Sequence, residues 1–213
     1  MNCKVTLKEI NNPCLEIRCE TMLRVNQRRF ITTFYQLFPR TFPKGEPTWS
    51  YEPGQLRKEY RALQAQHHPD MISQADSSNA TNDGGDQSSL LNKAYHTLKD
   101  PLLRSQYVLK LKDGIDLSQE QVAQEIMQRN PILLMQVLDI HEQLEEVENE
   151  EDVRVIEKEN KQRIKAIESQ LGKCYTDKQY DRAAELTVEL RYWVNLAKAI
   201  KEWEPGKPVN LTH

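Results

Sequence analysis

The sequence predicts an all-α protein in which an N-terminal helical hairpin is followed by an antiparallel three-helix bundle. Charged residues make up 29% of the 213 residues and only 7 are glycine, a composition typical of helix-rich proteins. Apolar residues recur at steps of three and four through the second half of the chain. Proline-rich and polar segments separate the apolar stretches, so we expect several helices joined by loops.

The net charge, the length of the apolar runs and the cysteine spacing argue against several classes of function. The net charge of −3 provides no global positive field, which disfavours nucleic acid as a partner. No apolar run approaches the roughly 20 residues that cross a bilayer, so no membrane partner is expected. The cysteines contain no Cys-x-x-Cys pair, which favours reduced thiols over a zinc site, and we predict no metal and no cofactor. They are Cys3, Cys14, Cys19 and Cys174.

The N-terminal extension, residues 1–32, changes composition at Met22. Acidic residues precede Met22, whereas the stretch 22–33 has three arginines, hydroxyl residues and no acid, as organellar targeting segments do. We hypothesise that Met22 is the working start codon and that Arg28-Arg29-Phe30 lies near a processing site. This interpretation predicts import into the mitochondrial matrix. The alternative is a basic N-terminus with no targeting role.

The first helices follow from residue 33 onward. A short apolar helix is expected over 33–38, a proline-rich loop over 39–53 and an amphipathic helix over 54–66. One side of the last helix should pack and its neighbouring sides should be cationic. The packing residues are Leu56, Tyr60 and Leu63, and the cations are Arg57, Lys58 and Arg61.

The tripeptide His68-Pro69-Asp70 ends this helix. Proline fixes its own φ, lacks a donor and disfavours helical geometry in the residue before it, so the helix should stop near Gln66. His68 and Asp70 then project from a rigid corner toward a partner. A reading of His67, His68 and Asp70 as metal ligands or an acid/base cluster is disfavoured, because adjacent histidines diverge and no further ligand follows at helical spacing.

A long polar loop is expected over 73–89, with helix resuming at Leu90. Asp100-Pro101 has the pattern of a cap followed by proline at the first helical position. Gly114 is expected to act as a hinge or cap.

Three further helices are expected after a short one that begins at the capping-box pattern Ser118-x-x-Gln121 and ends near Met127. Asn130-Pro131 caps the first long helix. Apolar stripes on the three long helices predict the bundle. The stripes are Leu133, Val137, Ile140, Leu144 and Val147; Val153, Ile156, Ile164, Ile167 and Leu171; and Ala183, Leu186, Leu190, Trp193, Ala197 and Ile200.

Some apolar residues lie off these stripes. Leu134 and Leu138 are rotated about 100° from the first stripe, and Tyr192 is flanked by two more such residues, Val188 and Leu196. These patches have a polar, acidic border, which is typical of a protein-binding face. The alternatives are that they broaden the core or pack against the N-terminal domain.

The order of these features resembles a J domain. A helix with a basic face ends in His68-Pro69-Asp70, a loop follows, and the next helix carries the residues of 91–98. The resemblance continues through 101–107 and 133–146 and covers nearly everything from about Met22. The sequence is similar to the HscB family, J-type co-chaperones of iron–sulfur cluster biogenesis, and most similar to its fungal mitochondrial branch, Jac.

The resemblance implies that the chain activates a mitochondrial DnaK-type heat-shock chaperone. In J domains the His-Pro-Asp corner docks beside the ATPase domain and accelerates ATP hydrolysis. Asp70 would pair with a chaperone arginine, His68 would contact backbone or linker, and Pro69 would fix the corner. This chain itself would break no bond, so it is expected to be an activator without catalytic residues. The cations that would meet an acidic chaperone surface are Arg57, Lys58 and Arg61.

The resemblance also implies that the bundle binds the cluster scaffold protein, Isu or IscU. The family's hydrophobic contacts fall on Leu134, Leu138 and Tyr192, the residues left over from the core. The absence of a Gly/Phe-rich segment after the J domain fits a specialised adaptor. The polar contacts fall on Gln136, where the fungal pattern has lysine, and on Asp139, Glu142, Gln143 and Glu146.

The predicted organisation has five parts. The parts are the extension 1–32, the J domain 33–112, a linker 113–117, the scaffold-binding bundle 118–205 and a tail 206–213.

The alternative function is a general helical adaptor without chaperone activity. In that case the acidic helix 145–159 is only a solvated face.

Overall fold

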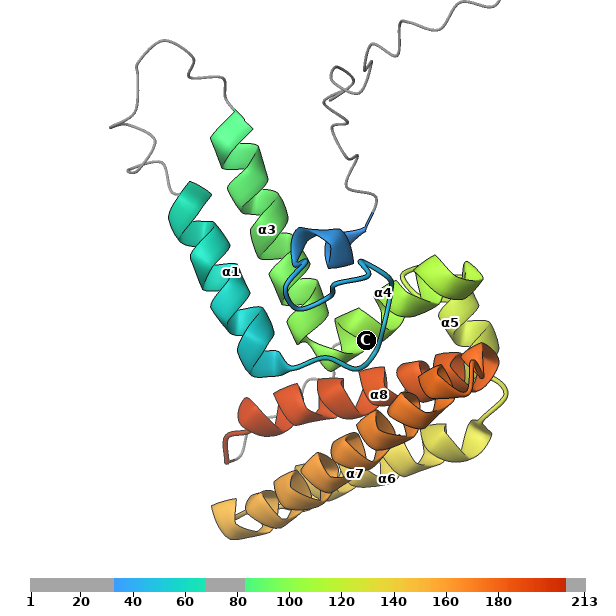
Figure 1. Cartoon of the computed structure of the whole chain (residues 1–213). Helices are drawn as coiled ribbons and strands as arrows, with labels where there is room; N and C mark the ends of the chain where they lie inside the picture. Colours follow the sequence, from blue (N-terminus) through green and yellow to red (C-terminus); the bar gives the residue numbers. More distant parts are fainter. Residues whose placement is uncertain (1–32, 68–82, 206–213) are drawn as a thin grey trace, which may run out of the picture. The chain divides into compact units, whose positions relative to one another are not determined.

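A computed structural model describes residues 33–67 and 83–205, and every regular element in these two ranges is helical (Figure 1). The all-α prediction is confirmed for them. The targeting segment predicted from Met22 to Arg28-Arg29-Phe30 and the corner His68-Pro69-Asp70 lie outside the described residues. In the described part of the chain, no helix has the length and hydropathy that a bilayer span requires. The elements are the 3₁₀ turn η1 (Phe34–Leu37), α1 (Pro53–His67), α3 (Asp83–Lys99), α4 (Pro101–Asp113), α5 (Glu120–Met127), α6 (Pro131–Glu146), α7 (Glu150–Thr176) and α8 (Tyr180–Lys201).

Helices α1 and α3 form the predicted hairpin, with η1 packed against α3. The Tyr60 hydroxyl donates to Asn92 Oδ1 at 2.6 Å, and Ser88 Oγ donates to Gln64 Oε1 at 3.2 Å. Later residues of α1 therefore pair with earlier residues of α3, which is the register of an antiparallel pair. Their shared hydrophobic cluster consists of Tyr35, Phe38, Phe42, Leu56, Leu91, Ala94, Leu98 and Val108.

The start of α3 contradicts the predicted extent of the polar loop over 73–89. It begins at Asp83, whereas the sequence predicted that helix resumes at Leu90. The prediction failed because 83–89 lacks the apolar periodicity on which it depended. A helix that is anchored by its apolar turns extends through polar residues without a core of its own, and the bond from Ser88 to Gln64 ties this polar turn to α1.

Helix α4 begins as predicted. Asp100 Oδ1 accepts a hydrogen bond from the Leu103 backbone N–H at 2.9 Å, and Pro101 occupies the first turn. The helix ends at Gly114, whose φ of 72° is left-handed and favours glycine. Gly114 is therefore a helix C-cap.

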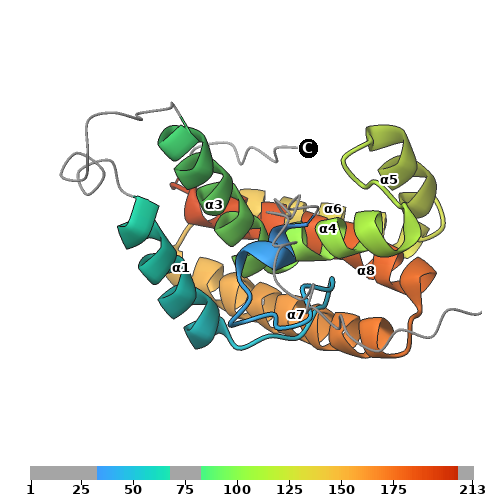
Figure 2. The same cartoon turned by 45° about the horizontal axis from the view of Figure 1, so that its top comes forward.

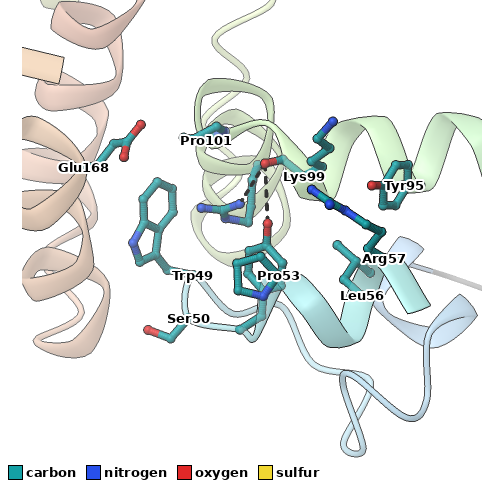
Figure 3. A pocket seen from close by; sticks show the side chains of 11 residues that line it. Trp49, Ser50, Pro53, Leu56, Arg57, Tyr95, Lys99, Pro101 and Glu168 are labelled. Carbon is teal, nitrogen blue, oxygen red and sulfur yellow. Dashed lines mark hydrogen bonds between the residues drawn. The ribbon is translucent and has the colours of Figure 1, made fainter. Parts of the chain in front are cut away.

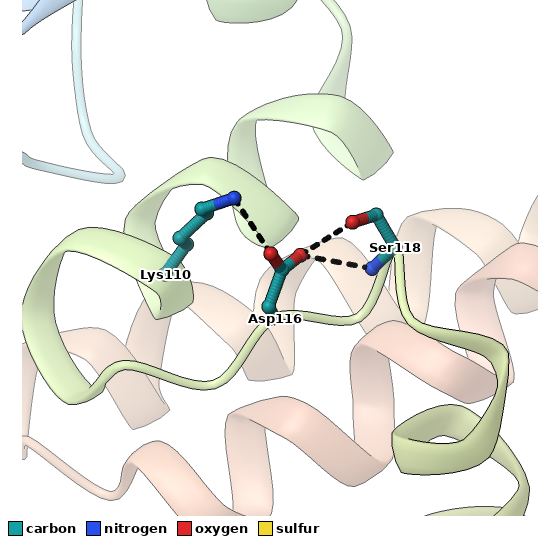
Figure 4. A network of polar contacts seen from close by, with 3 residues as sticks. All are labelled: Lys110, Asp116 and Ser118. Atoms are coloured by element: carbon teal, nitrogen blue, oxygen red, sulfur yellow. Dashed lines mark hydrogen bonds and ion pairs between the residues drawn. The ribbon is translucent and has the colours of Figure 1, made fainter.

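The predicted capping box at Ser118 is not formed in the turn after α4 (Figure 4). Helix α5 begins at Glu120, and its N-cap residue Gln119 makes no side-chain cap bond. The Ser118 hydroxyl instead donates to Asp116 Oδ1 at 2.6 Å, while Lys110 Nζ lies 2.6 Å from Asp116 Oδ2. The Ser118 side chain thus bonds to the upstream Asp116 and does not cap the helix. The capping-box pattern covers only residues 118–121, so it gave no sign of this competing partner.

The long helices α6, α7 and α8 form the predicted bundle (Figures 1 and 2). Asn130 and Asn149 cap α6 and α7 by accepting the N–H groups of Leu133 and Asp152. The core stripe of α7 contains one polar residue, Asn160, which is 1% exposed. Its side-chain amide donates to the Trp193 carbonyl at 3.0 Å.

Helix α8 is surrounded more fully than its sequence indicated, since it packs against α4, α5, α6 and α7. Val188 and Leu196, predicted to form an apolar patch outside the core, are 3% and 0% exposed. That part of the prediction is wrong because a helix with neighbours on several sides buries more than one stripe. Ala197, predicted in the stripe, is only half-buried.

Helix α4 connects the hairpin to the bundle. Its neighbouring residues Val108 and Leu109 belong to two different hydrophobic clusters, the hairpin's and the bundle's. Ser105 Oγ lies 2.6 Å from the hydroxyls of both Tyr175 on α7 and Thr187 on α8. The two parts of the fold are thus joined by apolar packing and by a buried hydroxyl network.

Candidate partner-binding surfaces

The first candidate surface is the cationic face of α1. The helix turns Leu56 and Glu59 inward, and these side chains are 1% and 5% exposed. The helical period then leaves the intervening residues outside. The exposed cations are Arg57, Lys58 and Arg61, as the sequence predicted.

Glu59 fixes this orientation and is a residue that the sequence analysis missed. Its carboxylate accepts hydrogen bonds from the backbone N–H groups of Arg40 and Thr41, at 2.8 and 2.7 Å, and from the Thr41 hydroxyl at 2.7 Å. Three donors satisfy a charge that would otherwise be costly to bury. A charged residue at an inward position of α1 was the only sequence signal for it.

Helix α1 ends at His67, directly before the predicted corner His68-Pro69-Asp70. The corner itself lies outside the described residues, so its role stays a prediction. The cations of α1 occupy the helix that leads to it.

The second candidate surface is the outward face of α6. The core stripe of this helix is buried, whereas Leu134 and Leu138 are 47% and 51% exposed. These two leucines therefore do not broaden the core, which was one of the alternatives left open by periodicity. The predicted polar contacts are also exposed: Gln136, Asp139, Glu142, Gln143 and Glu146.

Tyr192 on α8 lies at the edge of the bundle core and is half-buried. The Trp203 indole N–H donates to the Leu144 carbonyl at 3.2 Å, a pair separated by 59 residues. This bond ties the segment that follows α8 to the last turn of α6. The predicted patch on α8 thus reduces to this one tyrosine.

Two further apolar residues of α6, Ile132 and Met135, are each 65% exposed. The sequence analysis did not select them, although a helical wheel places Met135 opposite the core stripe and Ile132 about 110° from it. The exposed apolar face of α6 consequently extends beyond the predicted pair of leucines.

These surfaces suit protein contacts. Among the described residues, no group of His, Cys, Asp and Glu is arranged to hold a metal ion. Cys174 is buried in the bundle core. Exposed apolar side chains beside acidic ones on α6, and unburied cations on α1, are instead features of interfaces.

Comparison with known proteins identifies the family. A family model described as "HSCB C-terminal oligomerisation domain" matches residues 129–201. The chain is 57% identical over 187 residues to the mitochondrial J-type co-chaperone JAC1 of Saccharomyces cerevisiae, a match that covers 88% of this chain and 97% of that protein. The chain belongs to the HscB/Jac1 family of J-type co-chaperones. The resemblance seen in the sequence is therefore confirmed.

More distant members of the HscB/Jac1 family support the assignment. The HscB homologue of Haemophilus influenzae is 34% identical over 154 residues, covering 70% of this chain and 84% of its own length. Human HscB, named an iron-sulfur cluster co-chaperone protein, is 32% identical over 147 residues, covering 68% of this chain and 60% of its own length.

Solved structures agree with the fold. The Jac1 co-chaperone of S. cerevisiae matches with a TM-score of 0.72 at 54% identity, over 82% of this chain and 98% of that one. Human HscB matches with a TM-score of 0.64 at 24% identity, over 91% of this chain and 93% of that one, which concerns the fold alone. The hairpin and the bundle are thus the J domain and the C-terminal bundle of the HscB/Jac1 fold.

Proposed function

We propose that this protein is a mitochondrial co-chaperone that delivers an iron–sulfur cluster scaffold of the Isu/IscU type to a DnaK-type heat-shock chaperone. The observation that carries the proposal is the 57% identity to a mitochondrial J-type co-chaperone over 97% of that protein's length. The name of the human relative, an iron-sulfur cluster co-chaperone protein, supports the same process. The site of action would be the mitochondrial matrix.

The chaperone would be bound through α1 and the corner after it. His68-Pro69-Asp70 would dock beside the ATPase domain, and the exposed cations Arg57, Lys58 and Arg61 would meet an acidic surface there. Attraction between such faces accelerates association and weakens as salt is added. The protein would make and break no bond itself, since ATP is hydrolysed by the partner.

The scaffold would be bound through the α6 face and Tyr192. Leu134 and Leu138 supply apolar area that would otherwise stay in water, at about 25 cal/mol per Å² of apolar surface buried. The surrounding polar residues would form the rim of the interface. They are Gln136, Asp139, Glu142, Gln143 and Glu146.

The division of the chain into a J domain at 33–112, a linker at 113–117 and a scaffold-binding bundle at 118–205 is part of this proposal. It assigns the two partners to opposite parts of the fold. The chaperone and the scaffold can then bind at the same time.

ATP turnover by the mitochondrial chaperone tests the proposal. Addition of this protein should accelerate hydrolysis, and His68→Gln should abolish the acceleration while scaffold affinity stays unchanged. His67→Gln is the matched control, because it makes the same change one residue earlier, and it should retain activity. If His68→Gln stimulates as well as the wild type, the protein is a helical adaptor without chaperone activity and the proposal fails.

A further inference from the structure

A cavity of about 510 Å³ lies between the hairpin and the bundle, away from the α6 face (Figure 3). It is lined by the connector before α1 and by α1, α3, α4 and α7. Its lining carries three cations but one carboxylate. The charged residues of the lining are Arg57, Lys99, Arg104 and Glu168, and its aromatic residues include Trp49 and Tyr95.

The hairpin register brings Arg57 and Lys99 to the same end of the cavity. Tyr60 on α1 stacks on Tyr95 on α3, with ring centroids 3.9 Å apart. Arg57 lies one turn before Tyr60, and Lys99 lies one turn after Tyr95. Since the helices are antiparallel, these two steps point in the same direction, and Figure 3 shows both cations beside Tyr95, across the cavity from Glu168.

The third cation, Arg104, is already engaged. Its guanidinium donates to the Leu98 carbonyl at 2.7 Å and lies over the Trp49 ring. Burial raises the pKa of Glu168, and the positive charge of Arg104 acts against that rise. The lone carboxylate of the cavity therefore interacts with Arg104.

Arg57 and Lys99 have no such counter-charge among the side chains that the structure describes. None of the ion pairs formed by those side chains includes Arg57 or Lys99. Both side chains are exposed at the cavity mouth. Two like charges held at one end of a cavity attract an anion from outside the chain.

The aromatic rings of the cavity already contact other side chains. Trp49 lies against Tyr175 with centroids 5.4 Å apart and against Arg104 at 4.3 Å. Tyr95 is covered by Tyr60, and Lys99 Nζ lies 5.8 Å from its centroid. Tyr51 likewise lies near Arg104 at 4.7 Å and near Phe42 at 5.9 Å. Because each of these rings already has a neighbour, the charges of the cavity are the better basis for recognition of a ligand.

We propose that Arg57 and Lys99 together form a subsite for an acidic side chain of the partner chaperone. This inference rests on the proposed function, in which Arg57 belongs to the chaperone-binding face. It adds Lys99, so the contact surface continues from α1 across the hairpin to the end of α3. Cations on two different helices define the position of a carboxylate more narrowly than one flexible lysine does.

Binding of the full-length protein to the ATP-bound mitochondrial chaperone tests the subsite. Lys99→Gln and Arg57→Gln should each weaken binding by up to about fivefold, the upper end of the range for an exposed ion pair. The double variant should lose less than the product of the two single losses, because both side chains address one carboxylate. Lys99→Glu should weaken binding more strongly, and Lys99→Arg should retain it.

Lys93→Gln is the matched control, since Lys93 is an exposed lysine on another face of α3. If Lys99→Gln binds the chaperone as tightly as Lys93→Gln while His68→Gln abolishes stimulation, the subsite is refuted and the proposed function stands. If His68→Gln has no effect, the proposed function itself is refuted. Weaker scaffold binding by Lys99→Gln, with unchanged chaperone binding, would assign the cavity to the scaffold and also overturn the subsite.

Discussion

The guanidinium carbon of Arg104 lies 4.3 Å from the centroid of the Trp49 ring, which joins α4 to the connector before α1. The same carbon lies 4.7 Å from the centroid of the Tyr51 ring. Two aromatic rings and the carbonyls of Leu98 and Lys99 thus contact one buried cation. This arrangement stabilises the junction by cation–π and charge-assisted hydrogen bonds.

We therefore expect Arg104→Leu to lower the free energy of unfolding by about 2–4 kcal/mol, because it leaves buried carbonyls without a donor and removes the cation that contacts both rings. Arg104→Lys should recover only part of this loss, since an ammonium does not match the planar guanidinium. Urea unfolding followed by circular dichroism measures the change. Arg154→Gln, at a position exposed on α7, is the control and should stay within about 0.5 kcal/mol of the wild type.

The hydroxyls of Ser105 and Thr187 are predicted to act as a coupled pair. They lie 2.6 Å apart in a buried site, and Thr187 also donates to the Ala183 carbonyl. Ser105→Ala and Thr187→Val should each cost about 1–2 kcal/mol of stability. The double variant should cost less than the sum, and strict additivity in a double-mutant cycle would contradict the network.

The α6 surface yields a prediction for scaffold binding. Combined replacement of Leu134, Leu138 and Tyr192 by alanine should weaken binding by several kcal/mol, about 2–4 if these residues are clustered hot spots. Calorimetric titration with the purified scaffold measures it. Leu103→Ala is the matched control, because Leu103 is 39% exposed but lies on α4. Unaltered affinity in a folded triple variant would remove these residues from the interface.

Asp116 gives a prediction for acid stability. The hydrogen bonds from Lys110 and then from Ser118 lower the pKa of its carboxyl from 3.8 to about 2. The folded pKa is below the unfolded one, so the carboxylate stabilises the fold above about pH 4, and this contribution is lost as the pH falls toward about 2. Asp116→Asn should be less stable than the wild type at pH 7, with the difference closing in acid. A gap that persists unchanged down to pH 2 would contradict this, and exposed Asp113→Asn is the control.

Local signals predicted most of the helices. Asp100-Pro101 and Asn130-Pro131 act within one turn, so their caps can be read directly from neighbouring residues. The start of α3 was missed because a polar helical turn and a polar loop have the same composition. Ser118 was misassigned because its actual partner, Asp116, competes outside the capping pattern.

Residues whose role depends on distant partners were not predictable in this way. Glu59, Arg104 and Asn160 are buried polar residues, and each forms a hydrogen bond with backbone atoms of another segment. Val188 and Leu196 looked like surface because periodicity identifies one packed side, whereas α8 has four helical neighbours among the described elements. For the partner-binding surfaces, the sequence singled out the exposed pair Leu134 and Leu138 but not Met135.

The position of α4 limits how this protein can be recombined with its relatives. Val108 and Leu109 face two different clusters, so a chimaera joined at Gly114 would place a foreign hairpin's helix against this bundle. Such an exchange must carry the matching surfaces of α7 and α8 with it. The two halves of the chain therefore have to be exchanged together.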